Sequence, residues 1–246
     1  MFLLILVRIT GFMFTAPFFS LSNVPIRVKT GLAIFLTAIL FYTVPSSQPE
    51  YDTIMGYSIL VISEAIAGAI MGFFTNIAYY IIAFSGQLFD MEIGFSMINE
   101  LDPITKIETT ISANFYGYLI LLMMIITNLH HYFLRAIIDS FKIIGVGRIN
   151  LNPGMYQLMI QFITDYFIIG FRIALPVFAA ILVVNTILAI LAKVAPQMNM
   201  FVIGIQMKIF VGLIVLALII GLIPSVADFI FNEMVTMMKA SIEYFQ

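Results

Sequence analysis

The sequence predicts an all-α, polytopic membrane protein built of kinked helical hairpins. Hydrophobic residues make up 62% of the 246-residue chain, and charged residues make up only 10%. A soluble domain carries about a quarter charged residues, and it could not keep so much apolar surface away from water. Isolated charges also stand inside the long apolar stretches, and in a membrane protein such positions are where function is sought first.

The apolar stretches differ in length from ordinary membrane spans, which need about 20 helical residues to cross roughly 30 Å of hydrocarbon. The stretch 30–44 would be about 22 Å long as a helix, too short to cross unaided. Residues 53–84 and 158–192 are instead too long for one ordinary crossing. Such lengths favour a helical assembly in which partner chains satisfy broken backbone. The apolar stretches are 1–19, 30–44, 53–84, 111–134, 158–192 and 200–231.

Two stretches need separate comment. The first is expected to be a retained helix and not a signal peptide, because its basic residue, Arg8, lies within the apolar run and does not precede it. In the stretch 158–192, Pro176 removes a backbone hydrogen bond and is expected to bend or break the helix. Basic loop residues fall equally on both sides of a simple alternating topology, so the positive-inside rule gives no orientation.

The segment 135–157 is the longest run of turn-forming residues and is the best candidate for an internal boundary. It divides the chain into an N-terminal helical region, 1–150, and a C-terminal helical hairpin, 151–246. A tight turn around residues 195–199 is expected to close that hairpin. The turn-forming residues of the boundary segment are Gly145, Gly147, Asn150, Asn152, Pro153 and Gly154.

Glycines and one charge share a helix face in two of the stretches. Glu64 is followed by glycines four and eight residues later, and Lys208 is flanked by Gly204 and Gly212 at the same spacing. Glycines let a second backbone approach closely while the charge finds a partner away from lipid. With only one acid and one base on these faces, we favour helix packing over a proton or ion relay.

Asp165 and Arg172 stand seven residues apart, on nearly the same helix face but two turns distant. A direct pair would be strained, although a third group could join them. Structural neutralisation is favoured over catalysis, because an intramembrane arginine must be neutralised. The candidate intramembrane polar residues are Arg8, Glu64, Asp165, Arg172 and Lys208.

The least ordinary segment is 90–108, in which a short apolar tip lies between acidic flanks. Gly94 permits a sharp bend, and Asp102-Pro103 starts a turn. The tip Phe95-Ser96-Met97-Ile98 is too short to span a membrane and too apolar for a free loop. It is expected to bury itself against protein as a re-entrant or plug-like loop would, although ordinary loop packing explains it equally well.

Several functions are excluded or disfavoured by the residues present. The chain has no cysteine, so disulfides and thiolate chemistry are ruled out. Its only histidines, His130 and His131, are neighbours that point about 100° apart on a helix, which does not suit a metal site. No enzyme motif is present, and a formal charge of −2 gives no basic footprint for nucleic acid. The sequence therefore predicts a non-enzymatic protein without metal or cofactor.

A resemblance to a known family follows from the order of short motifs along the chain. Arg8, Ala16-Pro17, the stretch Pro25-x-Arg27-Val28-Lys29, Gly94-Phe95-Ser96-Met97 and Asp102-Pro103 come first, and Asn128-x-His130 follows. The strongest fragments are Ala174-Leu175-Pro176, Asn185, Ala195-Pro196-Gln197 and Phe201-Val202-Ile203-Gly204. In this order and spacing they resemble the FliR family of flagellar type III export-gate subunits, nearly end to end.

The resemblance implies an inner-membrane subunit of the flagellar basal body. It would build the gate with FliP and FliQ, beside FlhB and FlhA, and unfolded flagellar proteins would leave the cytoplasm through it. The region 1–150 would resemble FliP and the hairpin 151–246 would resemble FliQ. Two loops would have functions, one as a pore plug and one at the cytoplasmic entrance. The plug residues would be Gly94, Phe95, Ser96, Met97, Ile98 and Asn99, with Asp102 and Pro103 shaping the turn; the entrance residues would be Pro196, Gln197, Met198 and Asn199.

Three alternatives remain open at this stage. The chain could be the equivalent subunit of a virulence injectisome, of the SctT family, with the same chemistry and different cargo. It could be an ion-coupled secondary transporter using Glu64, Asp165, Arg172 and Lys208, although the expected inverted repeat is not visible. It could also be a scaffold subunit that never lines the pore.

Overall fold

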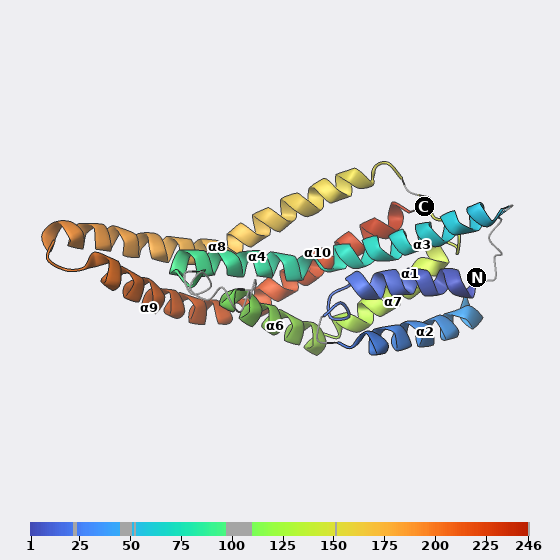
Figure 1. The fold of residues 1–246 in the computed structure, drawn as a ribbon, viewed down its shortest axis with the longest axis horizontal. Helices are drawn as coiled ribbons and strands as arrows, with labels where there is room; N and C mark the ends of the chain where they lie inside the picture. Colours follow the sequence, from blue (N-terminus) through green and yellow to red (C-terminus); the bar gives the residue numbers. More distant parts are fainter. Residues whose placement is uncertain (22–23, 45–50, 52, 97–109, 151, 246) are drawn as a thin grey trace. The chain divides into compact units, whose positions relative to one another are not determined.

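The computed structural model describes residues 1–21, 24–44, 51, 53–96, 110–150 and 152–245 (Figure 1). This part of the chain consists of helices joined by turns and loops, and no strand occurs in it. The helices are α1 (Phe2–Thr15), α2 (Ile26–Thr43), α3 (Ile54–Thr75), α4 (Ile77–Ile93), α6 (Ile111–Ile126), α7 (Leu129–Ile143), α8 (Met155–Val194), α9 (Met200–Ile220) and α10 (Ile223–Glu243).

Long apolar helices confirm the predicted fold class. Helices α2, α3, α8 and α9 are each long and apolar enough to cross a membrane. The bent pair α6 and α7 adds a fifth candidate when it is counted as one span. Helix α1 is equally apolar but has only 14 residues. The chain is therefore an all-α polytopic membrane protein.

Contacts between residues divide the chain into two compact units, each assembled from separated segments. Unit 1 comprises Met1–Ala78, Met124–Thr164 and Phe229–Gln246, and unit 2 comprises Tyr79–Met123 and Asp165–Asp228. This grouping follows spatial contact and does not bear on the likeness of regions 1–150 and 151–246 to FliP and FliQ. That likeness stays a prediction.

The prediction that the stretch 30–44 is too short to cross a membrane was wrong. Helix α2 begins at Ile26, directly after Pro25, and its 18 residues qualify it as a candidate span. Proline suits a helix start because the first N–H groups of a helix have no partner within it. Arg27 and Lys29 consequently lie in the helix, and the Lys29 ammonium donates to the carbonyl of Leu21 at 2.9 Å.

The stretch 53–84 is two helices and not one. Helix α3 ends at Thr75, and α4 begins at Ile77 after the break at Asn76. Helix α4 then continues to Ile93, so Asp90 and Glu92 lie in its last turn. These two acids form the acidic flank that precedes the apolar tip of the predicted plug-like segment, and that flank is therefore helical.

The stretch 111–134 is also broken, and the helix after the break is longer than expected. Asn128 takes a left-handed conformation, with φ 57°, which asparagine adopts more readily than most residues. Helix α7 then extends to Ile143, so much of the predicted boundary segment is helical. Its buried Phe133, Ile137 and Phe141 recur every four residues, but its exposed face is too polar to register as an apolar run.

The C-terminal stretches differ less from expectation. Pro176 lies inside α8, which continues through it without a break. The stretch 200–231 divides into α9 and α10 at Gly221, and α10 extends to Glu243. Pro224 lies in the first turn of α10, where its missing N–H leaves no hydrogen bond unmade.

Helix α1 packs against both α2 and α3 in unit 1. Its residues Leu4, Ile5, Ile9, Phe12 and Met13 are at most 1% exposed. Apolar side chains this completely buried stabilise a fold by about 1.5–3 kcal/mol each in water, and by close packing in a membrane. Helix α1 is therefore the core element of unit 1 in spite of its short length.

Small residues set the closeness of α1 and α3. A Cβ atom added to Gly68 would fall far inside contact distance of the Arg8 carbonyl oxygen, and one added to Gly72 would collide with Thr15 and Phe12. The Thr15 hydroxyl donates across the same contact to the carbonyl of Ala69 at 3.0 Å. This pattern of small residues and a hydroxyl is typical of helix packing in membranes.

The end of α10 also belongs to unit 1. The backbone N–H of Asn150 donates to the carbonyl of Phe245 at 3.2 Å, and that of Asn152 donates to Tyr244 at 3.4 Å. The C-terminal residues of the described chain thus hold the loop that precedes α8.

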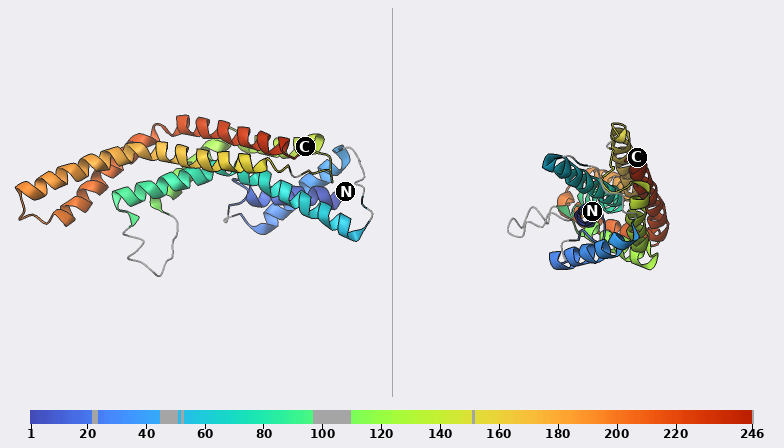
Figure 2. Two further views of the ribbon diagram at one scale, coloured as in Figure 1. Left: turned by 90° about the horizontal axis from the view of Figure 1, so that it is seen from above. Right: turned by 90° about the vertical axis from the view of Figure 1, so that its right-hand side faces the viewer.

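The part of α8 from Asp165 onward belongs to unit 2, and it forms a hairpin there with α9. The two helices lie side by side in both views, joined by the turn at residues 195–199 (Figure 1; Figure 2, left). Phe84 of α4 packs into α8, with its ring 5.1–5.4 Å from those of Tyr166, Phe167 and Phe171. The Ser85 hydroxyl adds a hydrogen bond of 3.0 Å to the carbonyl of Gly170.

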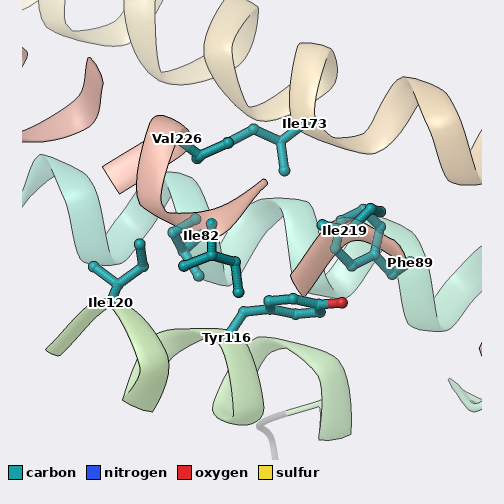
Figure 3. A pocket seen from close by; sticks show the side chains of 8 residues that line it. Ile82, Phe89, Tyr116, Ile120, Ile173, Ile219 and Val226 are labelled. Atoms are coloured by element: carbon teal, nitrogen blue, oxygen red, sulfur yellow. The ribbon is translucent and has the colours of Figure 1, made fainter. Parts of the chain in front are cut away.

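A small apolar cavity lies among the helices of unit 2 (Figure 3). It measures about 20 Å³, and Ile82, Phe89 and Ile219 are among the side chains that line it. The Tyr116 ring forms one wall, and its hydroxyl donates to the carbonyl of Leu216 at 2.7 Å. The volume is close to that needed for one water, but the apolar lining offers that water no partner.

The contact between α1 and α3 gives a direct test of the fold. Gly68→Ala should lower the thermal unfolding temperature in detergent, at a cost of roughly 1–3 kcal/mol, because the new methyl group must push two backbones apart. Gly31→Ala is the matched control, since a Cβ there meets nothing within 4 Å and alanine favours the helix. Equal stability of the two variants would contradict the packing described here.

Candidate functional site

Helix α4 ends where the predicted plug-like segment begins. Gly94 has φ +97°, a conformation that glycine adopts without strain, and its N–H donates to the Asp90 carbonyl at 3.0 Å. Phe95 and Ser96 follow, and both are half-buried. The remaining predicted plug residues, Met97, Ile98, Asn99, Asp102 and Pro103, lie outside the residues that the structure describes.

A buried carboxylate ties the two ends of this segment together. Asp90 is 1% exposed, and it accepts hydrogen bonds from the backbone N–H of Ser112 at 3.0 Å and from the Ser112 hydroxyl. Ser112 lies at the start of α6, where backbone N–H groups lack helical partners and the helix dipole favours a negative charge. Asp90 of α4 therefore caps α6.

Close backbone packing reinforces that cap. A Cβ added to Gly86 of α4 would collide with the backbone of Ala113 in α6. Because Gly86 and Asp90 are one turn apart, the contact and the cap lie on the same face of α4. Asp90, Ser112, Gly86 and Ala113 are called the loop base below. It holds the chain where it leaves α4 and where it returns in α6.

Arg8 and Glu64 form a buried ion pair in unit 1. Both side chains are 0% exposed. The Arg8 Nε–H donates to one oxygen of Glu64 at 2.5 Å, and a terminal guanidinium nitrogen donates to the other at 3.0 Å. This two-point geometry is the strongest arrangement available to an arginine and a carboxylate. It joins the middle of α1 to the middle of α3.

Helix α7 and the turn after it complete the surroundings of this pair. The second terminal nitrogen of Arg8 lies 3.4 Å from the Ser140 hydroxyl and 3.3 Å from the Ile144 carbonyl. The guanidinium carbon is 4.2 Å from the centre of the Phe141 ring. The Gly147 N–H donates to Glu64 at 2.7 Å. Arg8, Glu64, Ser140, Phe141, Ile144 and Gly147 are called the Arg8 cluster below.

The hydrogen bonds of the Arg8 cluster indicate a structural role. Both carboxylate oxygens of Glu64 accept from Arg8, and one accepts in addition from the backbone. Each nitrogen of the Arg8 guanidinium also has a partner within the protein. The polar atoms of this pair are therefore engaged in holding three segments together, in line with the preference for packing over a relay.

The other predicted intramembrane charges are not brought together. Asp165 is half-buried and Arg172 is exposed, and in the described part of α8 they form no ion pair with each other. Lys208 of α9 is half-buried and has no ion-pair partner among the residues that the structure describes. These charges thus remain accessible, in contrast to the Arg8 cluster.

The predicted entrance residues Pro196, Gln197, Met198 and Asn199 form the turn between α8 and α9, and all are exposed. The Asn199 side chain accepts from the backbone N–H groups of Phe201 and Val202, at 3.2 and 3.4 Å. Asparagine at this position is a favoured helix cap. The turn is thus well formed by local interactions, with its surface free for contact.

The two histidines lie closer together than their helix positions suggested. Their ring centres are 4.1 Å apart, and the Phe18 ring stacks on His130 at 5.7 Å. The 100° between neighbouring positions does not separate long side chains in the first turn of α7. Within the described ranges, no group of three His, Asp or Glu side chains is arranged to hold a metal ion.

These features define a polytopic helical membrane protein that uses its buried charges to pack its own helices. The model of the family described as bacterial export proteins, family 1, matches residues 1–234, and the chain belongs to that family.

Named relatives cover nearly the whole chain. The flagellar biosynthetic protein FliR of Bacillus subtilis (strain 168) is 32% identical over 97% of this chain and 93% of its own length. FliR of Escherichia coli (strain K12) is 26% identical over 93% and 87%, and FliR of Aquifex aeolicus (strain VF5) is 25% identical over 97% and 92%. The chain is a membrane component of the flagellar export apparatus, in the bacterial inner membrane. These names support flagellar cargo over the injectisome alternative.

Sequence reasoning singled out Arg8 and Glu64 separately but did not pair them. Their separation of 56 residues carries no periodic signal, and each had been assigned only a general need for a partner. The cap on α6 was missed for the same reason, because the loop between Asp90 and Ser112 hides their proximity. The available signal was Ser112, a polar residue at the start of an apolar helix, together with Asp90, an acid that needed a partner.

The Arg8 cluster predicts a non-additive effect on stability. Arg8→Met or Glu64→Met alone should cost about 3–5 kcal/mol, because each leaves one buried charge without its partner. The double variant should cost less than the sum of the two, as measured by thermal unfolding in detergent. Lys142→Met is the control, since its pair with Asp139 is exposed and should contribute less than about 1 kcal/mol. Additive losses would refute the coupling.

Proposed function

We propose that this chain forms part of the wall of the export channel through which unfolded flagellar proteins leave the cytoplasm, and that it catalyses no reaction. The observation that supports this best is the loop base, which fixes both ends of an apolar-tipped segment by a buried cap and a close helix contact. A segment held at both ends in this way is suited to position its apolar side chains at a fixed site in the channel. Energy for transport comes from other components of the apparatus.

In this proposal the segment that follows α4 is the plug of the closed channel. Gly94 sets the direction in which it leaves α4, because the left-handed conformation turns the chain sharply. Phe95, Ser96, Met97, Ile98 and Asn99 form the plug, and Asp102-Pro103 shapes the return. The unbranched, flexible side chain of methionine suits a seal that must yield to a moving polypeptide.

The chain works in this proposal as one subunit of a gate with FliP and FliQ. The regions 1–150 and 151–246 carry the likeness to FliP and to FliQ, and FlhB and FlhA lie at the cytoplasmic side. The exposed turn at residues 196–199 is the entrance loop, nearest to FlhB. Large apolar side chains such as Leu182, Phe201 and Phe210 are more than 60% exposed, a surface suited to neighbouring helices or lipid.

Measuring the mass of the purified particle tests the proposed assembly with FliP and FliQ. When the chain is purified in mild detergent with a tag at its C-terminal end, native mass spectrometry should show a large particle containing FliP and FliQ. The single variant Arg8→Met serves as control, because it leaves the buried Glu64 carboxylate unpaired, and a misfolded subunit should lose the partners. A folded monomer or homodimer as the sole species from unaltered protein would overturn the proposed assembly.

The plug is tested by removing it. Deletion of residues 95–98 should leave the particle intact and raise the leak of small ions across the inner membrane, because the apolar bulk that fills the channel is gone. A variant in which serines and glycines replace residues 95–98 should also leak ions, because the loop keeps its length but loses its apolar side chains. If assembly is normal and the leak is unchanged in both, the segment is not the plug.

A further inference from the structure

A groove in unit 2 is bounded by the last turn of α4 and by the hairpin of α8 and α9. Its volume is about 320 Å³, within the size range of ligand-binding pockets. The described residues that line it include Glu92, Asn185, Leu188, Gly204, Ile205 and Lys208. It is called the α4–α9 groove below.

The glycine–lysine–glycine face of α9 builds this groove. A Cβ on Gly212 would collide with Ile93 at the end of α4, and one on Gly204 would lie 3.3 Å from the Leu188 side chain of α8. Each glycine thus packs one side of α9 against a neighbouring helix. Lys208 lies one helical turn from Gly204 and one from Gly212, so it is placed between these two helix contacts. Its side chain lines the groove between them.

Charges of both signs face this groove without pairing. Lys208 and Glu92 line it together, yet neither forms an ion pair with any residue that the structure describes. Helix α9 has a mean hydropathy of 2.5, so a charge in its interior is costly unless something polar meets it. Asn185 adds a donor and an acceptor from α8. The groove therefore calls for an occupant with both hydrogen-bond donors and acceptors.

We infer that the α4–α9 groove binds the main chain of an extended polypeptide in passage, with Glu92 accepting from its N–H groups and Lys208 donating to its carbonyl groups. This rests on the proposed function. The main chain is the one part shared by all unfolded proteins, and it carries a donor and an acceptor at each residue other than proline. Apolar walls such as Leu188 and Ile205 accommodate side chains without selecting among them.

The balance of charges favours this occupant over a simple ion or a partner helix. Glu92 would repel an anion that bound Lys208, and Lys208 would repel a cation that bound Glu92. A helix satisfies its own N–H and carbonyl groups internally, so it would leave both charges unmatched unless it carried charges of its own. An extended segment offers the required groups along its whole length.

Cysteine cross-linking tests contact directly, because the chain has no native cysteine. Cells with the complete apparatus would carry Ile205→Cys and an export substrate with one cysteine, fused to a tightly folded domain so that it stalls in the channel. A disulfide between the two chains is expected for several unrelated substrate sequences. Leu213→Cys is the control, since Leu213 is 52% exposed on α9 and is not among the lining residues.

Charge reversal tests the role of each side chain. Lys208→Glu removes the donor to main-chain carbonyl groups, and Glu92→Lys removes the acceptor of main-chain N–H groups, so each should slow export several-fold for every substrate, whatever the charge of its leader. The yield of the disulfide between substrate and Ile205→Cys should fall in the same proportion, while the amount of assembled gate stays unchanged. A loss confined to acidic or to basic leaders, or a lower yield of assembled gate, would overturn the inference.

The outcomes separate this inference from the proposed function. If export needs the chain but no substrate disulfide forms at Ile205→Cys, or if the disulfide joins another subunit, the groove does not hold substrate. If removing the whole chain leaves export unaffected, the proposed function itself fails. A substrate disulfide at Ile205→Cys and none at Leu213→Cys, together with equal losses for acidic and basic leaders in both charge variants, is the result that supports the inference.

Discussion

The pairing of Arg8 with Glu64 is the constraint on which unit 1 depends. Two charges that are completely buried among apolar helices must meet, because either alone would be too costly. Their meeting fixes α1 against α3, and the remaining Arg8 donors fix α7 and the turn after it. The glycines of α3 make this possible by letting the α1 backbone approach closely enough for the side chains to pair.

The two units use charge in opposite ways. In unit 1 each nitrogen of the Arg8 guanidinium donates to a protein acceptor, so the charge holds helices together. In unit 2 the buried Asp90 does similar work at a helix start, but Lys208 and Glu92 face open space. A charged group whose hydrogen bonds are already made within the fold is not available to bind a passing molecule. Contact with substrate is therefore to be sought in unit 2.

The membrane class, the helical content and the family were all accessible from sequence, because they depend on composition and on motif order. Helix ends were less accessible. The breaks at Asn76 and Asn128 involve no proline, and the amphipathic α7 looks like a loop when only apolar runs are counted. The pairs Arg8–Glu64 and Asp90–Ser112 could not be derived, because partners far apart in sequence are fixed by tertiary packing alone.

The cap of α6 by Asp90 limits how strongly the stability of the fold depends on the length of the segment between α4 and α6. Once two points of a chain are held together by the surrounding fold, the entropy of the segment between them depends only weakly on its length, at about 0.6 kcal/mol for each doubling. Changes in the length of the segment between Gly94 and Thr110 should therefore cost the fold of unit 2 little free energy, whatever they do to the function of the segment itself.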